Sequence, residues 1–426
     1  MGHLATKRSL AGRVFRGAVH FFLLFPLTHS AAASMVILAL TLPGCATVDG
    51  LVGYCQIGWE LGTPKQALPA RLEVAGRVPV LHLYGSPHEM GTQYGTLLGR
   101  ALRAESRCIH GFLPTQTVEQ YLQFARAHEV DLPPEIREEL HAMAEASGVP
   151  YDELVALNIV PHVTCSALAV WNPAAPESSA TRPAAEPGGL IMGRNADYYS
   201  FGFQDRGSIL VVRHQVPGSC QHATACISFL GMVGGFTGMN DRGVSFANML
   251  VFNASTRPGD AGDPGKGAIT IQLAMRLAAE NSANVADMAV ALERQPHLIP
   301  MLVMVADSRR AEVLELSPEG HRARTSSSGI LAASNYFLTD LAEEPYDCPR
   351  YAKLIRAAAQ AETEHGHPEM TLEEMKDAIY KAAIKKMNMQ AVIMEPGPRR
   401  LHVSINQMPA AAGPYTTFEM GELLAK

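Results

Sequence analysis

The sequence lacks the short motifs that mark several common enzyme classes. It contains no G-x-S-x-G and no H-E-x-x-H. Their absence argues against a serine hydrolase built on a nucleophile elbow and against a zinc metallohydrolase. It also has no CxxC pair and no His/Cys cluster with zinc spacing, so we expect no metal and no cofactor.

An excess of positive charge is also missing. The 426 residues carry a formal net charge of −6. The first 44 residues contain four basic side chains and no acidic one, so the remainder holds 31 basic and 41 acidic residues, a net charge of −10. Nucleic-acid binding needs basic patches, and this balance predicts no nucleic-acid partner. The apolar content of 47% and charged content of 18% are typical of a globular chain.

No apolar run is long enough for a typical membrane-spanning helix. Basic residues precede two short runs, Phe21–Phe25 and Met35–Leu42, so we interpret residues 1–44 as a signal segment. Leu42-Pro-Gly-Cys45 resembles the bacterial lipobox, whose cysteine is lipidated. We therefore expect an exported, periplasmic or cell-envelope lipoprotein of a bacterium, held at the membrane through Cys45, with residues 45–70 as a tether. An ordinary signal peptide with a chance cysteine, and a start at Met35, are the alternatives.

Export would allow the remaining cysteines to form disulfides. Cys220 and Cys226 are close enough in sequence to bridge a turn, but the connectivity cannot be derived from the sequence.

The chain divides into a helical part and a strand-rich part. Residues 134–147 place Ile136, Leu140 and Met143 on one helical face, and Gly148 is positioned to end that helix. From residue 165 onward, apolar strand-like runs follow one another as meanders. They are interrupted by helical patterns, including a capping box that begins at Thr371. This order predicts an α+β protein with antiparallel sheets covered by helices.

Cys165 stands where the helical part ends and the strands begin. The next strand-like run closes with Gly193-Arg-Asn-Ala-Asp197. A cysteine at a strand start, with an arginine and an aspartate on the neighbouring strand, suggests a nucleophile with electrostatic support. A small buried hydrophobe beside a surface ion pair is the alternative.

Taken together, the motifs resemble the self-cleaving acyl-CoA:6-aminopenicillanate acyltransferase family. The resemblance extends, more distantly, to acid ceramidase, the N-acylethanolamine acid amidase and the choloylglycine hydrolases. It covers residues 78 to the C-terminus and rests on the order and spacing of several short motifs. These are Gly85-Ser-Pro-His-Glu-Met-Gly91, Cys165, Gly193-Arg-Asn-Ala-Asp197, Thr237-Gly-Met-Asn-Asp-Arg-Gly243, Ser334-Asn-Tyr-Phe337, Arg350 and Gly413-Pro-Tyr415.

The resemblance implies a four-layer αββα fold of the N-terminal-nucleophile hydrolases. It also implies a cut between Thr164 and Cys165, giving a small subunit of residues 71–164 and a catalytic subunit of residues 165–426. The new α-amine would serve as the base for the thiol, because such an amine titrates near neutral pH. Thr164 departs from the glycine that precedes the cysteine in the penicillin enzyme.

The resemblance also implies roles for the other site residues. Asp197 would orient the amine, Arg194 would favour the thiolate, and Asn335 would donate to the oxyanion. The sequence leaves Asn248, Arg350 and Tyr198 as possible support for substrate or oxyanion, with turn, packing and helix-start roles as the alternatives.

We therefore expect an amidase or acyltransferase acting on a small N-acyl or acyl-CoA-like substrate. A non-catalytic lipoprotein that binds a small amphiphile in the same pocket is the rival. The identity of the substrate, the choice between hydrolysis and transfer, and the oligomeric state are left open.

Overall fold

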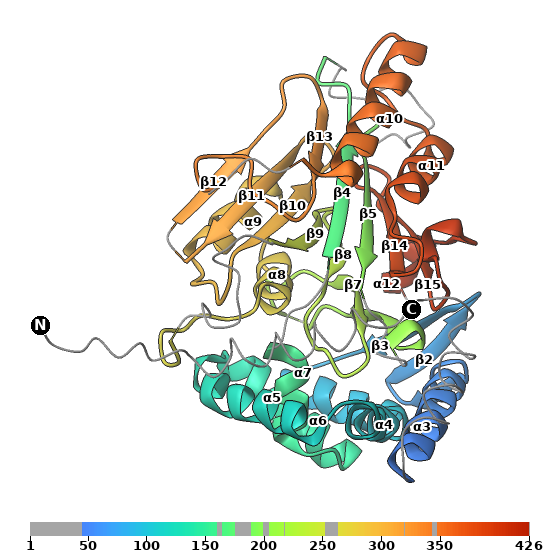
Figure 1. The fold of residues 1–426 in the computed structure, drawn as a ribbon, viewed down its shortest axis with the longest axis vertical. Helices are drawn as coiled ribbons and strands as arrows, with labels where there is room; N and C mark the ends of the chain where they lie inside the picture. The colour runs from blue at the N-terminus through green and yellow to red at the C-terminus, as the bar shows by residue number, and fades with distance from the viewer. Residues whose placement is uncertain are drawn as a thin grey trace, which may run out of the picture.

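The computed structural model describes residues 45–159, 164–174, 189–198, 204–216, 218–251, 263–318, 320–342 and 347–425. In these ranges two β-sheets lie face to face and helices cover their outer sides, as Figure 1 shows. Both sheets are almost entirely antiparallel, as the meandering strand pattern predicts.

The larger sheet has ten strands in the order β1-β2-β3-β6-β7-β8-β9-β10-β11-β12. Only the β3–β6 pair is parallel, which joins the N-terminal strands to the later meander. The strands are β1 Lys65–Ala67, β2 Ala70–Ala75, β3 Val78–Leu83, β6 Ser208–Arg213, β7 Thr224–Phe229, β8 Thr237–Asn240, β9 Ser245–Leu250, β10 Met301–Ala306, β11 Ala311–Ser317 and β12 Gly320–Arg324.

The smaller sheet has six strands in the order β13-β4-β5-β14-β15-β16. It places the strand of Cys165 directly beside the strand of Arg194 and Asp197. The strands are β4 Thr164–Val170, β5 Ile191–Asp197, β13 Ile330–Ala333, β14 Asn388–Glu395, β15 Arg400–Ile405 and β16 Thr416–Glu419.

Three apolar interfaces separate four layers. One lies between helices and the ten-stranded sheet, one between the two sheets, and one between the six-stranded sheet and α10 and α11. This αββα layering confirms the expected fold class. The helices are α3 Cys45–Leu61, α4 Pro87–Phe112, α5 Thr115–His128, α6 Pro134–Ser147, α7 Tyr151–Ile159, α8 Ile271–Ala279, α9 Val285–Arg294, α10 Pro349–His365, α11 Leu372–Ala382 and α12 Met420–Ala425.

Local sequence signals explain several helix boundaries. Gly148 ends α6 with φ of 73°, a left-handed conformation that glycine adopts at little cost. The capping box predicted at Thr371 is present, with Glu374 returning the hydrogen bond. A second capping box, Ser86 with Glu89, begins α4.

The expectation that residues 45–70 form a tether is wrong. The segment folds into α3 and β1, and it packs against the rest of the molecule through Tyr54, Ile57 and Leu61. Glycine allows this packing, because a Cβ added to Gly53 would lie 2.6 Å from the carbonyl oxygen of Ala104 on α4. The N-terminal helical part also supplies β2 and β3 to the larger sheet, so it is not separate from the strand-rich part.

No disulfide links the cysteines whose side chains the structure describes, and Cys220 and Cys226 are therefore not joined. Among the described residues, no group of His, Cys, Asp and Glu side chains has the arrangement of a metal site. No helix in the described ranges has both the length and the apolar character needed to cross a membrane.

Candidate active site

Cys165 lies near the start of β4, with its side chain directed between the two sheets. Side chains alternate along the strand: Cys165 and Ala167 join the central core, whereas Leu168 packs on the helix side. The residue is fully buried. The thiol therefore lies inside the sandwich rather than on an exposed loop.

Arg194 on β5 contacts the thiol directly. Its Nη2 donates to Cys165 Sγ at 2.9 Å, and the guanidinium is fully buried. Nη1 donates to Oε1 of Gln390 at 3.2 Å, and Nη2 lies 3.5 Å from both the backbone and side-chain oxygens of Asn248. The structure therefore brings together Cys165, Arg194 and Asn248, which the sequence places on three separate strands.

Opposing effects act on the pKa of the Cys165 thiol. Burial raises the pKa of the Cys165 thiol above its ordinary value, and the negative charge of Asp197 adds to that effect. The guanidinium groups of Arg194 and Arg350 act in the opposite direction. Burial outweighs the two guanidinium groups, so the pKa of the Cys165 thiol lies above its ordinary value.

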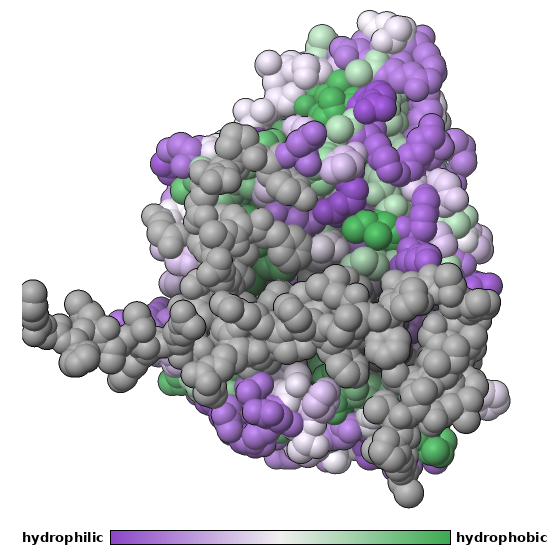
Figure 2. All heavy atoms as spheres, viewed as in Figure 1, coloured by the Kyte–Doolittle hydropathy of each residue, from purple (hydrophilic) through white to green (hydrophobic). Residues whose placement is uncertain are grey.

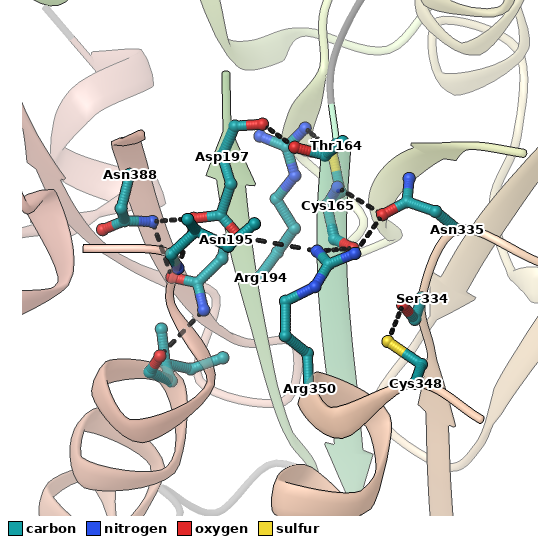
Figure 3. A network of polar contacts seen from close by, with 12 residues as sticks. Thr164, Cys165, Arg194, Asn195, Asp197, Ser334, Asn335, Cys348, Arg350 and Asn388 are labelled. Atoms are coloured by element: carbon teal, nitrogen blue, oxygen red, sulfur yellow. Dashed lines mark hydrogen bonds and ion pairs between the residues drawn. The ribbon is translucent and has the colours of Figure 1, made fainter. Parts of the chain in front are cut away.

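Arg350 and Asn335 hold the backbone of Cys165 from both sides. Arg350 Nη1 donates to the carbonyl oxygen of Cys165 at 2.7 Å, and its Nη2 donates to Oδ1 of Asn335 at 2.7 Å. The same Oδ1 accepts the N–H of Cys165 at 2.9 Å (Figure 3). Arg350 thus lies in the first turn of α10 and also contacts the backbone of Cys165. A role of Arg350 in supporting substrate or oxyanion stays a prediction.

The orientation of the Asn335 amide is fixed by its partners. Two donors face its oxygen, and its Nδ2 donates to the carbonyl oxygen of Leu250. In this arrangement the group that faces Cys165 is an acceptor, suited to an N–H or an amine. The oxyanion role that the resemblance implies for Asn335 stays a prediction.

Asp197 ends β5 on the side of the helices α10 and α11. Its Oδ1 accepts from Nδ2 of Asn388 at 2.9 Å and from the N–H of Ile384 at 3.2 Å. Its Oδ2 is buried without a hydrogen bond among the described residues and lies 3.5 Å from Nη1 of Arg350. Burial raises the pKa of the Asp197 carboxyl, while Arg350 and Asn388 oppose the rise.

Two further predicted residues flank this centre. Thr164 pairs with Asp197 across β4 and β5, and its hydroxyl donates to the Asp197 carbonyl oxygen. Tyr198, directly after β5, packs at the edge of the central core, and its N–H donates to the carbonyl oxygen of Met387 at 2.6 Å. The structure therefore gives Tyr198 a packing position.

Sequence reasoning missed Asn388 and Gln390. Asn388 is fully buried and donates to both Asp197 and Asn195, while its own oxygen accepts the N–H of Ala411. Gln390 links Arg194 to Ser208 on the opposite sheet. The available signal was the pair of amide side chains directly before the apolar run Ala391–Met394 of β14, since buried polar groups need partners.

Residues 184–399 match the family of acyl-coenzyme A:6-aminopenicillanic acid acyl-transferase. The chain belongs to this family. The matched range contains Arg194, Asp197, Asn248, Asn335 and Arg350, and it begins after Cys165. The roles of these residues and of Cys165 stay predictions.

An uncharacterized protein of Archaeoglobus fulgidus is 23% identical over 275 residues, which is 58% of this chain and 44% of that protein. The chain thus matches less than half the length of this relative.

Solved structures also resemble the chain. The N-acylethanolamine-hydrolyzing acid amidase ortholog of Caenorhabditis elegans is 16% identical with a TM-score of 0.39, covering 55% of this chain and 93% of that one. A mutant of conjugated bile acid hydrolase from Clostridium perfringens is 15% identical with a TM-score of 0.41, covering 61% and 94%. Penicillin V acylase from Agrobacterium tumefaciens is 11% identical with a TM-score of 0.38, covering 61% and 87%.

Proposed function

We propose that the protein is a self-processed amidase or acyltransferase whose nucleophile is the thiol of Cys165. Two hydrogen bonds made by Cys165 carry this proposal. Arg194 donates to its thiol sulfur, and Asn335 accepts its backbone N–H. An N-terminal cysteine needs a stabilised thiolate and a held amine at the same residue. The guanidinium of Arg194 would stabilise the thiolate, and the amide oxygen of Asn335 would hold the amine.

The proposed self-cleavage breaks the Thr164–Cys165 bond. The thiol attacks the carbonyl carbon of Thr164, the C–N bond breaks, and the proton of the thiol passes to the departing nitrogen. Water then hydrolyses the resulting thioester, which leaves Thr164 with a carboxylate and Cys165 with a free amine. Arg350 and Asn335 hold the carbonyl and the N–H of Cys165 during this step.

Turnover would use the same atoms. The α-amine takes the proton of the thiol, and the thiolate attacks the acyl carbon of an amide or thioester. When the tetrahedral intermediate collapses, the leaving amine or thiol takes that proton and the acyl group stays on Cys165 Sγ. The buried Oδ2 of Asp197, which lacks a hydrogen bond among the described residues, is suited to accept from the ammonium form.

The substrate class is an N-acyl amide or an acyl thioester. The family name describes acyl transfer from coenzyme A to 6-aminopenicillanic acid, and the similar structures are named for acyl amides, conjugated bile acids and penicillin V. The shared chemistry is attack on a carbonyl attached to nitrogen or sulfur. Release by water makes the protein a hydrolase, and release by an amine makes it a transferase.

A panel of acyl amides and acyl thioesters, read by mass spectrometry, tests the proposal. We expect acyl transfer to water or to a supplied amine with the wild-type protein, and none with Cys165→Ala. Cys108→Ala is a matched control, because Cys108 is also buried but lies on α4 among the helices. Turnover by Cys165→Ala would exclude the thiol as nucleophile. A folded wild-type protein that binds members of the panel without converting them would favour the rival amphiphile-binding lipoprotein.

We also propose that the protein is exported and anchored to the membrane through a lipid on Cys45. The outer side of α3 supports this, because Val48, Val52 and Trp59 share one stripe and are 59%, 55% and 72% exposed. Hydrophobic atoms lie at the lower right of Figure 2, where Figure 1 places α3. Membrane fractionation of wild-type and Cys45→Ser cells tests it, and equal release of both into the soluble fraction would contradict it.

A further inference from the structure

Two residues next to the site are joined by a contact that the proposed mechanism does not use. Ser334 precedes Asn335 after β13, and Cys348 precedes Pro349 and Arg350 at the start of α10. Their side chains meet at 3.0 Å between Oγ and Sγ, and both are buried (Figure 3). The contact therefore ties the chain segment of Asn335 to that of Arg350.

The relative position of these two segments decides the contacts made to Cys165. Asn335 Oδ1 accepts from both Cys165 N–H and Arg350 Nη2, and Arg350 also donates to the carbonyl oxygen of Cys165. A shift of α10 relative to Asn335 and Cys165 would disturb both hydrogen bonds of Arg350. Displacements of about 1 Å in such an arrangement cost up to about 100-fold in rate.

Cys348 is also the N-cap of α10, and its carbonyl oxygen accepts the N–H of Ala352 at 3.0 Å. Burial opposes ionisation of the Cys348 thiol. The contact with Ser334, the nearby backbone of Tyr351 and the positive charge of Arg350 outweigh this and hold its pKa below the ordinary value. The contact between Ser334 and Cys348 therefore lies directly at the start of α10.

We infer that Ser334 and Cys348 are positioning residues, which hold Asn335 and Arg350 in the register needed at Cys165. Neither residue touches the thiol of Cys165 or the atoms of the scissile bond in the proposed mechanism. Their effect is exerted through their chain neighbours. The kinetic part of this inference rests on the proposed function, and the geometric part stands without it.

The geometric test is a crystal structure of Cys348→Ala. We expect Arg350 to move away from the carbonyl oxygen of Cys165, so that the 2.7 Å hydrogen bond of the native protein is lost. The conservative variant Cys348→Ser, which restores a hydrogen-bonding group, is expected to keep that bond. Unchanged Arg350 and Asn335 contacts in a folded Cys348→Ala protein would overturn the inference, whatever the protein catalyses.

The kinetic test uses Cys348→Ala, Ser334→Ala and the double variant. We expect each single variant to lower kcat about tenfold with little change in KM, and Cys348→Ser to recover most of the loss. The double variant is expected to fall no further than the single ones, because both remove the same contact. Cys108→Ala is the matched control, since its buried thiol also makes a hydrogen bond, to the Gly50 carbonyl oxygen, far from the site.

The two proposals fail in different ways. If wild type is active, Cys165→Ala is inactive and Cys348→Ala has full kcat with only a lower melting temperature, the positioning role is excluded and the proposed function stands. If Cys165→Ala is as active as wild type, the proposed function fails, while the crystal structure of Cys348→Ala still decides the positioning role.

Discussion

Two buried charge clusters in this molecule differ in how completely their charges are matched. In the helical layer, Glu139 on α6 accepts from Arg213 on β6 and from Arg276 on α8, and Arg276 also pairs with Glu280. The two arginines outweigh the effect of burial and hold the pKa of Glu139 below its usual value. The carboxylate of Glu139 is thus paired with two buried positive charges.

The cluster at Cys165 is matched less completely. Burial raises the pKa of both the Cys165 thiol and the Asp197 carboxyl. Both clusters contain buried polar atoms without hydrogen bonds among the described residues: Nε of Arg194 and Oδ2 of Asp197 here, and Nε and Nη1 of Arg213 in the helical layer. The contrast therefore rests on the opposite pKa shifts of the acidic groups. Burying unmatched polar groups costs free energy, and perturbed pKa values of this kind gather at functional sites. We therefore expect the Glu139 cluster to hold the fold together and the Cys165 cluster to take part in the proposed reaction.

The largest expected effect lies in the matched cluster. Replacing Glu139 by Ala leaves Arg213 and Arg276 buried without their carboxylate, and we expect a loss of about 3–5 kcal/mol in the free energy of unfolding. Chemical denaturation measures it. Glu138→Ala is the control, because Glu138 is exposed on the same helix. A loss no greater than that of the control would mean that Glu139 does not hold this layer.

The second expected effect is on activity. Asp197→Asn removes the charge that the ammonium of Cys165 would meet, and we expect turnover to fall about 100- to 1000-fold. The free energy of unfolding should change by less than about 1 kcal/mol, because the buried charge is costly in the native state. Paired activity and denaturation measurements decide this. A large loss of stability with normal turnover per folded molecule would make Asp197 a structural residue like Glu139.

A third prediction concerns the residue that orients Asp197. Asn388→Ala removes a hydrogen bond that lowers the pKa of the Asp197 carboxyl. We therefore expect kcat to fall about tenfold and the acidic limb of the rate profile to move to higher pH. Asn281→Ala, a change at an exposed asparagine, provides the control for the profile. If the acidic limb of the rate profile does not move, Asn388 does not set the pKa of Asp197 that governs the rate.

The smallest expected effect is on the pH dependence of the free energy of unfolding. As the pH rises, the contribution of Asp197 falls and that of Glu139 grows. Asp197 holds its proton more tightly in the folded state, so its contribution to the free energy of unfolding falls as pH rises from about 4 to its raised pKa. Glu139 contributes stability above about pH 4.3, and that stability is lost as pH falls through its lowered pKa.

Comparing each single variant with wild type isolates these contributions. Asp197→Asn should abolish the fall in the free energy of unfolding as the pH rises above about 4. Glu139→Gln should abolish the loss in the free energy of unfolding as the pH falls below about 4.3. Each difference amounts to about 1.4 kcal/mol per unit of pKa shift. Urea denaturation between pH 3 and 7 measures both. If the pH dependence of the free energy of unfolding changes in the same direction in Asp197→Asn and Glu139→Gln, the predicted difference between the two clusters is wrong.

Sequence reasoning succeeds where local patterns decide the structure. The boundaries of α6 follow from its apolar face and from Gly148, and the start of α11 follows from its capping box. The positions of Cys165 on β4 and Arg194 on β5 follow from the order of the strand-like runs. These features depend on residues within a few positions of each other.

It fails where distant segments decide the structure. Residues 45–61 carry no strong amphipathic pattern, and their place in the fold depends on contacts with the distant helix α4, which Gly50 and Gly53 approach closely. Asn388 and Gln390 look like ordinary strand residues until the pairing of β14 with β5 places them beside Asp197 and Arg194. Strand pairing across nearly 200 residues is not encoded in a local pattern.

The mass of the purified wild-type protein tests the central claim most directly. If Cys165 is an N-terminal nucleophile, intact-mass and N-terminal analysis will find a chain that begins at Cys165, and the Cys165→Ala protein will stay joined at this bond. A folded wild-type protein that retains the Thr164–Cys165 bond, and is nevertheless active on an acyl amide, would contradict the account.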